Sequence, residues 1–335
     1  MVFLLMNLFR NNKMNKIPIL NNDDWDETML SKRCELYSMY SSLTSSITTD
    51  MSKMMIPIDD HLVHRGDGVF ESFKCVEGSI YNLDAHLDRF VYSSQKIGLK
   101  VPYSKEELKE IIIQTTLASE HENSSVRVLL SRGAGTMGID PFECTGEILY
   151  VVVYSINKII KMDSNLEVAS LATSLIPVKA GYLAKVKSCN YLTNVLMKIE
   201  EKTFDVDYVV SVDEDGNIGE GATENIGIVT YDNRLITPLP ERVLPGTTAK
   251  RIIELAKYLV EDDIIKYTGY ENFSKEQMLN AKEIHIYGTT QGVVSVIEYD
   301  KKLVGNGKPG KVAQKLFQLL KEDKVPENTI LTKVF

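Results

Sequence analysis

Apolar residues follow strand-like patterns in four stretches of the first half of the chain. Tyr, Leu and Ser recur over residues 35–46, and residues 68–83 hold two apolar runs around Glu77-Gly78, a pair that favours a turn. β-branched and aromatic residues are dense again over 126–132 and 147–154. We therefore expect a sheet in this half.

Two helical patterns lie between these strands. Asp84 is a residue type that caps a helix start, and Gly98 stands where a helix ends. The apolar positions between them are Leu87, Phe90, Val91 and Ile97. Ser104 and Glu107 form a capping-box pattern before the apolar residues Leu108, Ile111 and Ile112. The first half is thus predicted to be a sheet with helices.

The second half repeats this mixture. Residues 166–173 predict a strand, and residues 207–221 and 224–238 each predict strand, turn and strand, with turns at Asp215-Gly216 and Asp232-Asn233. Helices and short strands then alternate to the end of the sequence. The polar residues 155–165 predict a linker between two domains.

Composition narrows the class of protein. The chain has 335 residues, 44% hydrophobic and 25% charged, and its net charge of -8 argues against nucleic-acid binding. No apolar run reaches the roughly 20 residues needed to cross a bilayer. Four scattered cysteines form no CxxC pair and five histidines form no ligand motif. We expect no disulfide framework, no metal and no membrane partner.

Residues 184–202 place four lysines in one short segment. The apolar stripe Leu192, Val195, Leu196 and Ile199 predicts an amphipathic helix, with Lys198 and Lys202 facing solvent. Ser188 and Asn190 are capping residue types, so Lys187 is expected just before the positive end of that helix. An amine kept neutral there can act as a nucleophile toward a carbonyl compound. Lys185 remains the alternative.

Three further segments of the second half are candidates for binding an anionic ligand. Pro245-Gly246 breaks the chain before Thr247 and Thr248, which open a predicted helix whose free N–H groups suit a phosphate. The buried stripe of that helix is predicted to be Ile252, Ile253, Ala256 and Leu259. Another apolar strand ends at Gly288, Thr289 and Thr290, and Glu220 stands between two glycines at a strand entry.

Six segments occur in an order that resembles one enzyme family. They are HRGDGVFE, LDAHLDR, VKSCNYL, GEGATEN, LPGTTAK and GTT, between about Tyr37 and Leu320. This order resembles the class IV, fold-type IV aminotransferases, which use pyridoxal 5'-phosphate and include branched-chain and D-amino-acid aminotransferases and 4-amino-4-deoxychorismate lyases. The variant IPIDDHLVHRGDGVFES is most similar to the D-amino-acid aminotransferase-like and aminodeoxychorismate lyase subgroup.

The resemblance implies a role for each matching residue. Lys187 matches the catalytic Schiff-base lysine, and Glu220 matches the acid that pairs with the pyridine nitrogen of the cofactor. Arg89 matches the phosphate-binding arginine and Tyr191 the tyrosine on the ring oxygen. The other implied phosphate contacts are Thr247, Thr248 and Thr289. Arg65, Asp67 and Phe70 match the RGDGVFE block, and we expect Phe70 and Thr290 to line the substrate pocket.

The substrate is less constrained by the sequence. The Arg-x-His pair that traps the substrate carboxylate in D-alanine enzymes has no counterpart in residues 129–146, which disfavours the typical D-alanine enzyme. Arg132 or Arg127 is expected to bind a carboxylate. We predict an aminotransferase that exchanges an amino group between an amino acid and a 2-oxo acid. The alternative is the lyase that releases pyruvate and 4-aminobenzoate, and a catalytically silent cofactor-binding protein is the third reading.

The resemblance also implies a two-domain architecture and a partner. We expect an α/β (α+β) fold with a disordered or loosely attached extension over 1–36. A small α/β domain over 37–154 and a larger pseudobarrel domain over 166–335 should follow, with the cofactor between them. A homodimer is implied, with loops such as Arg127 to Ile139 shared between active sites. The extension is acid-free up to Asp23. We expect a cytoplasmic protein, with organellar targeting by the extension left open.

Overall fold

The computed structural model describes residues 35–156, 165–179, 181–325 and 330–335. The predicted extension over 1–36 and linker over 155–165 fall almost wholly outside the described residues. The predicted boundaries of the two domains, 37–154 and 166–335, therefore stay predictions.

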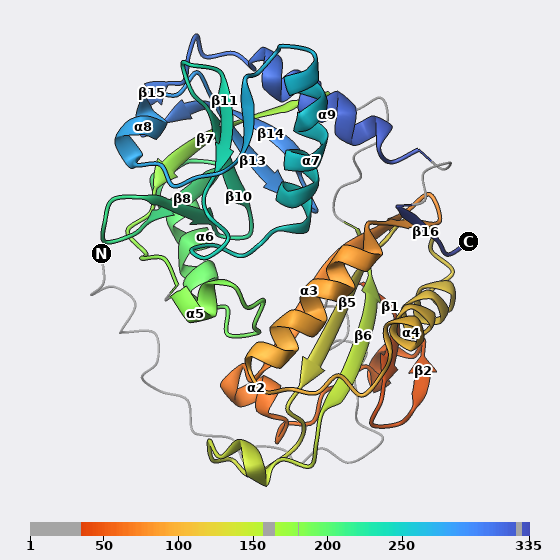
Figure 1. The fold of residues 1–335 in the computed structure, drawn as a ribbon. Coiled ribbons are helices and arrows are strands. Elements are labelled where there is room, and N and C mark those ends of the chain that lie inside the picture. The colour runs from red at the N-terminus through yellow and green to blue at the C-terminus, as the bar shows by residue number, and fades with distance from the viewer. Residues whose placement is uncertain (1–34, 157–164, 180, 326–329) are drawn as a thin grey trace, which may run out of the picture. The chain divides into compact units, whose positions relative to one another are not determined.

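The first sheet has seven strands, in which every neighbouring pair is antiparallel (Figure 1). In sheet order the strands are β16 (Leu331–Lys333), β4 (Ser79–Tyr81), β3 (Gly68–Val76), β5 (Ser124–Ser131), β6 (Ile148–Tyr154), β1 (Leu36–Ser41) and β2 (Ser46–Thr48). The helical segments of this part are 3-10 turns at Met51–Lys53 and Pro141–Glu143, α2 (His61–Arg65), α3 (Leu83–Lys96) and α4 (Lys105–Leu117). The predicted strands and the turn at Glu77-Gly78 are confirmed.

Helices α3 and α4 cover one face of this sheet and form its core. Leu83, Leu87 and Phe90 of α3 and Leu108 and Ile112 of α4 pack against the inward-facing residues of the strands. The capping box of Ser104 and Glu107 is present.

The predicted helix cap at Asp84 is wrong. The residue at the N-cap of α3 is Asn82, in a left-handed conformation and without a side-chain cap. Asp84 lies in the first turn, and its carboxylate binds Lys105 and Lys109 of α4 instead. It therefore ties the two helices together rather than starting one of them.

The second sheet has nine strands and curls on itself. Its order is β12 (Tyr267–Tyr270), β11 (Arg234–Thr237), β10 (Asn225–Val229), β13 (Glu283–Gly288), β14 (Gly292–Tyr299), β7 (Glu167–Thr173), β8 (Tyr208–Val212) and β9 (Ile218–Gly221), with β15 (Lys302–Leu303) beside β14. Four strands separate β9 from β10 in this order, yet Gly221 N–H donates to Glu224 O just before β10. The sheet must therefore bend round like part of a barrel.

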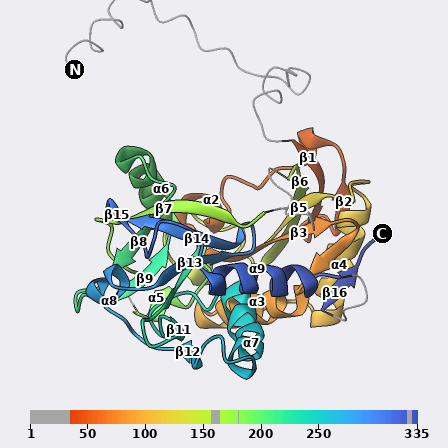
Figure 2. The ribbon, with the colours of Figure 1, turned by 90° about the horizontal axis from the view of Figure 1, so that it is seen from above.

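Two long helices pack on the second sheet. The helices of this part are α5 (Gly181–Ala184), α6 (Leu192–Phe204), α7 (Thr247–Glu261), α8 (Lys275–Leu279) and α9 (Lys311–Glu322). The predicted stripe of α7 is buried and packs with α9 against β13 and β14. Figure 2 shows α9 leading toward β16, the strand that returns to the edge of the first sheet.

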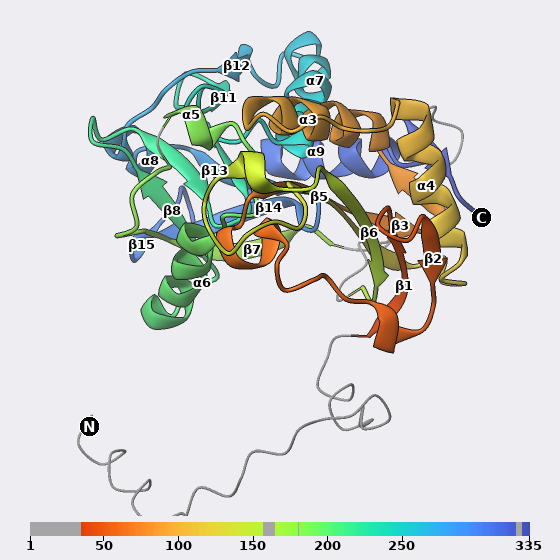
Figure 3. The same cartoon turned by 90° about the horizontal axis from the view of Figure 1, so that it is seen from below.

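Helix α6 forms where the apolar stripe predicts it, but the stripe faces outward. Leu192 and Ile199 are 65% and 56% exposed, whereas Asn194, Met197 and Glu201 are buried. The polar face is inside because Asn194 donates to the carbonyl of Ala222 and Met197 packs beside it. Helix α6 accordingly projects from its neighbours in Figures 2 and 3.

Candidate active site

A cavity of about 220 Å³ is lined by residues of both sheets. The sequence-predicted residues that it brings together are Phe70, Arg89, Lys187, Tyr191, Glu220, Thr247, Thr248, Thr289 and Thr290. Arg127 and Lys179 also line it, whereas Lys185 and Arg132 do not. Of the two lysines that the sequence left open, Lys187 is the one at the cavity.

Backbone contacts on both sides fix Lys187. Its carbonyl accepts from the N–H of Phe70 at 2.9 Å, and its own N–H donates to Ser93 Oγ at 3.2 Å. The next residue, Ser188, forms a bridge to Val69 of β3. The amine lies 4.7 Å from the centre of the Phe70 ring. Contacts with β3 and α3 thus fix the backbone of Lys187 at the cavity.

The environment of Lys187 favours a neutral amine. Burial, followed by repulsion from Arg89, lowers the pKa of Lys187 to about 8, although Glu71 and Glu220 attract its charge. The predicted cause, a helix end capped by Ser188 or Asn190, is wrong, because α6 begins after Tyr191 without a side-chain cap. Burial and the charge of Arg89, rather than a helix dipole, therefore lower the pKa of Lys187.

A buried network positions Arg89. Its Nε and Nη2 donate to the two oxygens of Glu71 at 2.7 and 2.8 Å, and its Nη1 donates to Pro245 O at 3.2 Å. Glu71 also binds Nδ1 of His86 at 2.7 Å, and Nε2 of that ring lies 3.3 Å from Thr247 Oγ1. Burial lowers the pKa of His86, which favours the neutral ring. The network links the first sheet to the start of α7.

Sequence reasoning missed Glu71 and His86. Both stand inside the segments GVFES and LDAHLDR, but nothing in either segment indicates that they meet. Their pairing depends on α3 lying across β3, which places residues 15 positions apart in hydrogen-bond contact. A rare charged residue in an apolar strand was the available signal, since a buried carboxylate is seldom left unpaired.

Glu220 is a half-buried acid of β9 that also lines the cavity. One of its oxygens accepts from the N–H of Leu244 at 2.9 Å. Burial raises the pKa of Glu220, and the positive charges of Lys179 and Lys187 oppose that change. Lys179 lies 4.8 Å from the centre of the Tyr191 ring, and sequence reasoning missed it as well. A carboxylate in this position is suited to pair with a positively charged group in the cavity.

The threonines form a seat for an anion. Thr247 and Thr248 open α7, and its N-cap, Gly246, supplies no side-chain acceptor for their N–H groups. A side chain at Gly246 would displace the Asn225 amide, because its Cβ would lie 1.8 Å from Oδ1 of Asn225. Thr289 follows β13 on the other side of the cavity.

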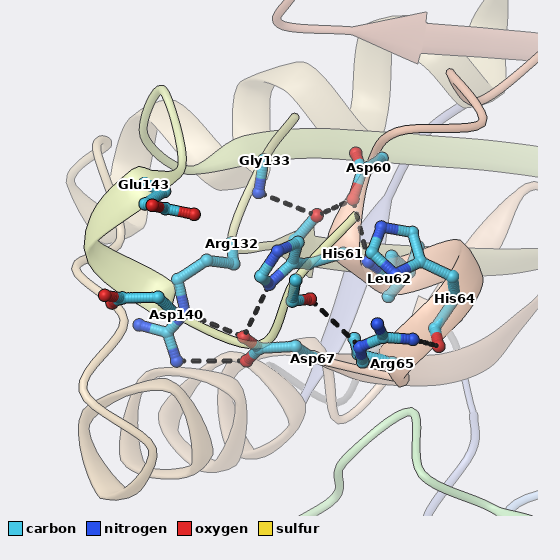
Figure 4. Close-up of polar contacts among 12 residues, drawn as sticks. Asp60, His61, Leu62, His64, Arg65, Asp67, Arg132, Gly133, Asp140 and Glu143 are labelled. Carbon is cyan, nitrogen blue, oxygen red and sulfur yellow. Dashed lines mark hydrogen bonds and ion pairs between the residues drawn. The ribbon is translucent and has the colours of Figure 1, made fainter. Parts of the chain in front are cut away.

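Arg132 is not brought to the cavity. Its guanidinium donates to both oxygens of Asp67 at 3.0 Å (Figure 4). It also donates to the carbonyls of Ile97 and Gly98. It therefore holds the end of β5 to α2 and α3. Arg127, which lies within β5, is 5.4 Å from the centre of the Phe70 ring at the cavity wall.

Comparison with known proteins identifies the family. The family profile described as "Amino-transferase class IV" matches residues 68–299. The chain belongs to the class IV aminotransferases. It is 36% identical over 310 residues to a D-amino-acid transaminase, chloroplastic, of Arabidopsis thaliana, covering 92% of this chain and 82% of that one. It is 28% identical to a putative branched-chain-amino-acid aminotransferase of Methanocaldococcus jannaschii, covering 82% and 92%.

Solved structures confirm the predicted fold of this class IV aminotransferase. A branched-chain amino acid aminotransferase from T.th., solved with pyridoxamine 5'-phosphate, superimposes with a TM-score of 0.80 at 24% identity, covering 90% of this chain and 99% of that one. The Escherichia coli branched-chain enzyme gives 0.79 at 22% identity, covering 90% and 100%.

Family membership confirms the predicted enzyme class. The protein is an aminotransferase that uses pyridoxal phosphate, and its substrates are small-molecule amino acids and 2-oxo acids. The lyase alternative is not favoured, because the named relatives are transaminases. Over the described parts of the chain, every helix is too short or too polar to cross a membrane.

Proposed function

We propose that Lys187 carries the cofactor and moves the substrate proton in this aminotransferase. The observation that supports the proposal is one cavity that is lined by a lysine of lowered pKa, a half-buried acid and the threonines at the start of α7. These groups fit pyridoxal phosphate in kind: an amine for its aldehyde, a carboxylate for its pyridine nitrogen and uncapped helix N–H groups for its phosphate. When bound, the cofactor supplies a ring that accepts the electron pair left by removal of the α-proton.

The remaining roles belong to side chains of the protein. Glu220 would hold a proton on the ring nitrogen, and Thr247, Thr248 and Thr289 would bind the phosphate. Arg89 would add its positive charge there, since Glu71 keeps its guanidinium fixed. Burial raises the pKa of Tyr191, so its hydroxyl keeps a proton to donate to the ring oxygen.

Nζ of Lys187 is the atom that takes and returns the α-proton. Its pKa of about 8 leaves part of the amine unprotonated near neutral pH, as a general base requires. The Phe70 ring beside the amine excludes water and limits the directions in which Nζ can move. The backbone bonds of Lys187 to Phe70 and Ser93 keep that geometry constant.

We propose Arg127, rather than Arg132, for the substrate carboxylate. Its guanidinium lies at the cavity wall between the rings of Phe70 and Tyr154. Among the described residues its side chain makes no hydrogen bond or ion pair, so its charge is available. Thr290, at the end of β13, lines the same space.

We propose D-amino acids as the first donors to test. The identity of 36% with the Arabidopsis D-amino-acid transaminase supports this choice. Branched-chain L-amino acids are the second candidate, because the Methanocaldococcus relative carries that name.

The test follows the visible absorbance of the purified holoenzyme. A donor amino acid should convert the bound cofactor to its amine form and a 2-oxo acid should restore the original spectrum. D-alanine, L-leucine and both isomers of glutamate would be mixed separately, with Lys187→Ala as the inactive control and Lys185→Ala as the matched active one. Borohydride treatment of the holoenzyme should leave a phosphopyridoxyl group on Lys187. A label on another lysine, or turnover by Lys187→Ala, would contradict the assignment.

We propose that two copies of the chain form a dimer through the exposed stripe of α6 and the loop at 134–145. The loop tip presents Met137, Ile139 and Phe142, which are 62%, 81% and 93% exposed. The loop is held in place because Arg65 donates to the carbonyls of Met137 and Gly138. A held apolar tip is typical of a surface that packs against a partner. We propose that the tip reaches the active site of that partner.

Light scattering tests the dimer. Phe142→Glu should lower the measured mass toward one chain and reduce activity in parallel. Tyr231→Glu changes another exposed aromatic residue, 69% exposed and away from these elements, and should leave the dimer intact. A wild-type mass of one chain would refute the proposal.

The predicted cytoplasmic location also stays a proposal, and the Arabidopsis relative is named chloroplastic. A fluorescent protein fused after residues 1–36 tests it. Diffuse fluorescence would support the cytoplasm, and an organellar signal would refute it.

A further inference from the structure

A short turn of the second sheet carries two of the threonines that line the active-site cavity. The turn joins β13 to β14, and Gly288 and Gly292 are the pair of residues at its base. Thr289 and Thr290 lie between them and line the cavity. The positions of both threonines therefore depend on what holds turn 288–292 in place.

The side chain of Gln291 folds back over this turn. A Cβ at Gly288 would lie 2.5 Å from Oε1 of Gln291, so a larger residue there would displace the Gln291 amide. Gly292, which follows, has a φ of 71°, in the left-handed region that favours glycine. The missing side chain at Gly288 thus leaves the space that the Gln291 amide occupies.

Glu224 binds this amide from the neighbouring strand. Asn225 of β10 pairs with Tyr287 of β13, so Glu224, one residue before Asn225, comes beside turn 288–292. Its Oε1 accepts a hydrogen bond from Nε2 of Gln291 at 3.0 Å. One carboxylate therefore joins the segment before β10 to the turn after β13.

The carboxylate of Glu224 is itself held on several sides. Its side chain is 1% exposed. The N–H of Thr223 donates to it at 2.9 Å, and the Thr223 hydroxyl donates as well. Nζ of Lys198, which also donates to both oxygens of Glu201, lies 3.6 Å from Oε1 of Glu224. A buried carboxylate with these partners has little freedom to move, so Glu224 is a fixed acceptor for Gln291.

We propose that Glu224 and Gln291 are positioning residues, whose hydrogen bond fixes Thr289 against the cofactor phosphate and Thr290 at the substrate. The inference rests on the proposed function, which assigns these roles to the two threonines. Glu224 and Gln291 line the cavity, but they bind each other and take no part in the attachment of the cofactor or in proton transfer. Loss of their bond should therefore weaken the binding of cofactor and substrate and change kcat little.

Release of the cofactor from the holoenzyme tests the effect on Thr289. Glu224→Ala and Gln291→Ala should each release the cofactor about tenfold faster or more, as expected for loss of a hydrogen bond to a charged group. Glu224→Gln keeps an acceptor for Gln291 and should restore release to within a few-fold of wild type. Glu201→Gln changes the other carboxylate at Lys198, which does not line the cavity, and should release the cofactor as wild type does.

The outcome does not depend on one variant. Gln291 is half-buried, so Gln291→Ala carries the test even where Glu224→Ala does not fold. Release at the wild-type rate from Gln291→Ala, or from a folded Glu224→Ala, would overturn the proposal. Rapid release from Glu224→Gln would overturn it too, because the bond to Gln291 would then not be what matters.

Double variants distinguish positioning from a general loss of stability. Glu224→Ala/Gln291→Ala should release the cofactor no faster than the faster of the two single variants, because both remove one bond. In Thr289→Ala, the further change Glu224→Ala should speed release by less than about twofold, since the residue that it positions is already lost. Rates that multiply in the first pair would refute the bond, and rates that multiply in the second would refute its action through Thr289.

Steady-state kinetics with saturating cofactor tests the effect on Thr290. Glu224→Ala should raise KM for the amino acid about tenfold and keep kcat within a few-fold of wild type, because Lys187 and Glu220 are unchanged. A loss confined to kcat would contradict the positioning role. Failure of the proposed function has a different signature, since Lys187→Ala would then keep its cofactor attached. If Lys187→Ala loses the cofactor while Glu224→Ala behaves as wild type, only the positioning role fails.

Discussion

Replacing Glu71 by glutamine should destabilise the protein, because this carboxylate neutralises a buried arginine. Glu71 accepts hydrogen bonds from Arg89 and His86 and is fully buried. Burial alone would raise its pKa, but Arg89 and then His86 lower it from 4.5 to about 2. Each pKa unit is worth about 1.4 kcal/mol, so the ionised carboxylate stabilises the folded protein by about 3 kcal/mol at neutral pH. Glu71→Gln should lose an amount of that order.

The pH dependence of this loss has a definite sign. The folded-state pKa of Glu71 is depressed, so its contribution is complete above the unfolded value and disappears as the pH falls toward the folded one. The difference in free energy of unfolding between wild type and Glu71→Gln should be constant between about pH 6 and 8. It should fall to less than half near about pH 3.

Urea unfolding of the cofactor-free protein across this pH range measures the effect. Glu106→Gln changes an exposed carboxylate in the first turn of α4 and should differ from wild type by less than about 0.5 kcal/mol. The reasoning would be refuted by a Glu71→Gln protein as stable as wild type at neutral pH. A difference that does not shrink in acid would refute it as well.

Three further predictions concern the cavity. Lys187→Ala should lower kcat by about 10³-fold or more, whereas Lys185→Ala should stay within a few-fold of wild type in the same assay. Cofactor-free Lys187→Met should be up to about 3 kcal/mol more stable than wild type at pH 7, because folding lowers the pKa of the Lys187 amine from 10.5 to about 8. Thermal unfolding should show that this difference in stability disappears as the pH rises from about 8 to about 10.5. Arg127→Met should raise KM for the amino acid about tenfold with less change in kcat. Arg132→Met should leave KM unaltered and lower Tm, since Asp67 loses the Arg132 guanidinium. The opposite pattern in steady-state kinetics would show that Arg132, and not Arg127, binds the substrate carboxylate.

Local signals in the sequence predicted local structure well. The capping box of Ser104 and Glu107 and the buried stripe of α7 both depend on neighbours within a few residues, and both are confirmed. Lys187 could be singled out for a similar reason, since it precedes a helix pattern in a segment that matches a family motif.

Long-range pairings were beyond the sequence. Arg132 has the same chemistry as Arg127, and only the position of Asp67, 65 residues away, decides which one is engaged elsewhere. The outward stripe of α6 follows from a bond between Asn194 and Ala222, which no periodicity contains. Periodicity identifies the apolar face of a helix, but what covers that face depends on contacts made by distant residues.

The pairing of β16 with β4 has a consequence for synthesis of the chain. Tyr81 of β4 and Asp323 are 242 residues apart yet share a hydrogen bond, and the adjoining strand Leu331–Lys333 completes the edge of the first sheet. On the ribosome, β4 is therefore made long before the strand that covers it. Its open edge must wait through translation of the whole second sheet, and an open edge is a template for pairing with other chains. The first sheet, whose strands are mostly synthesised before the second sheet, is thus completed only when the last strand of the chain has been made.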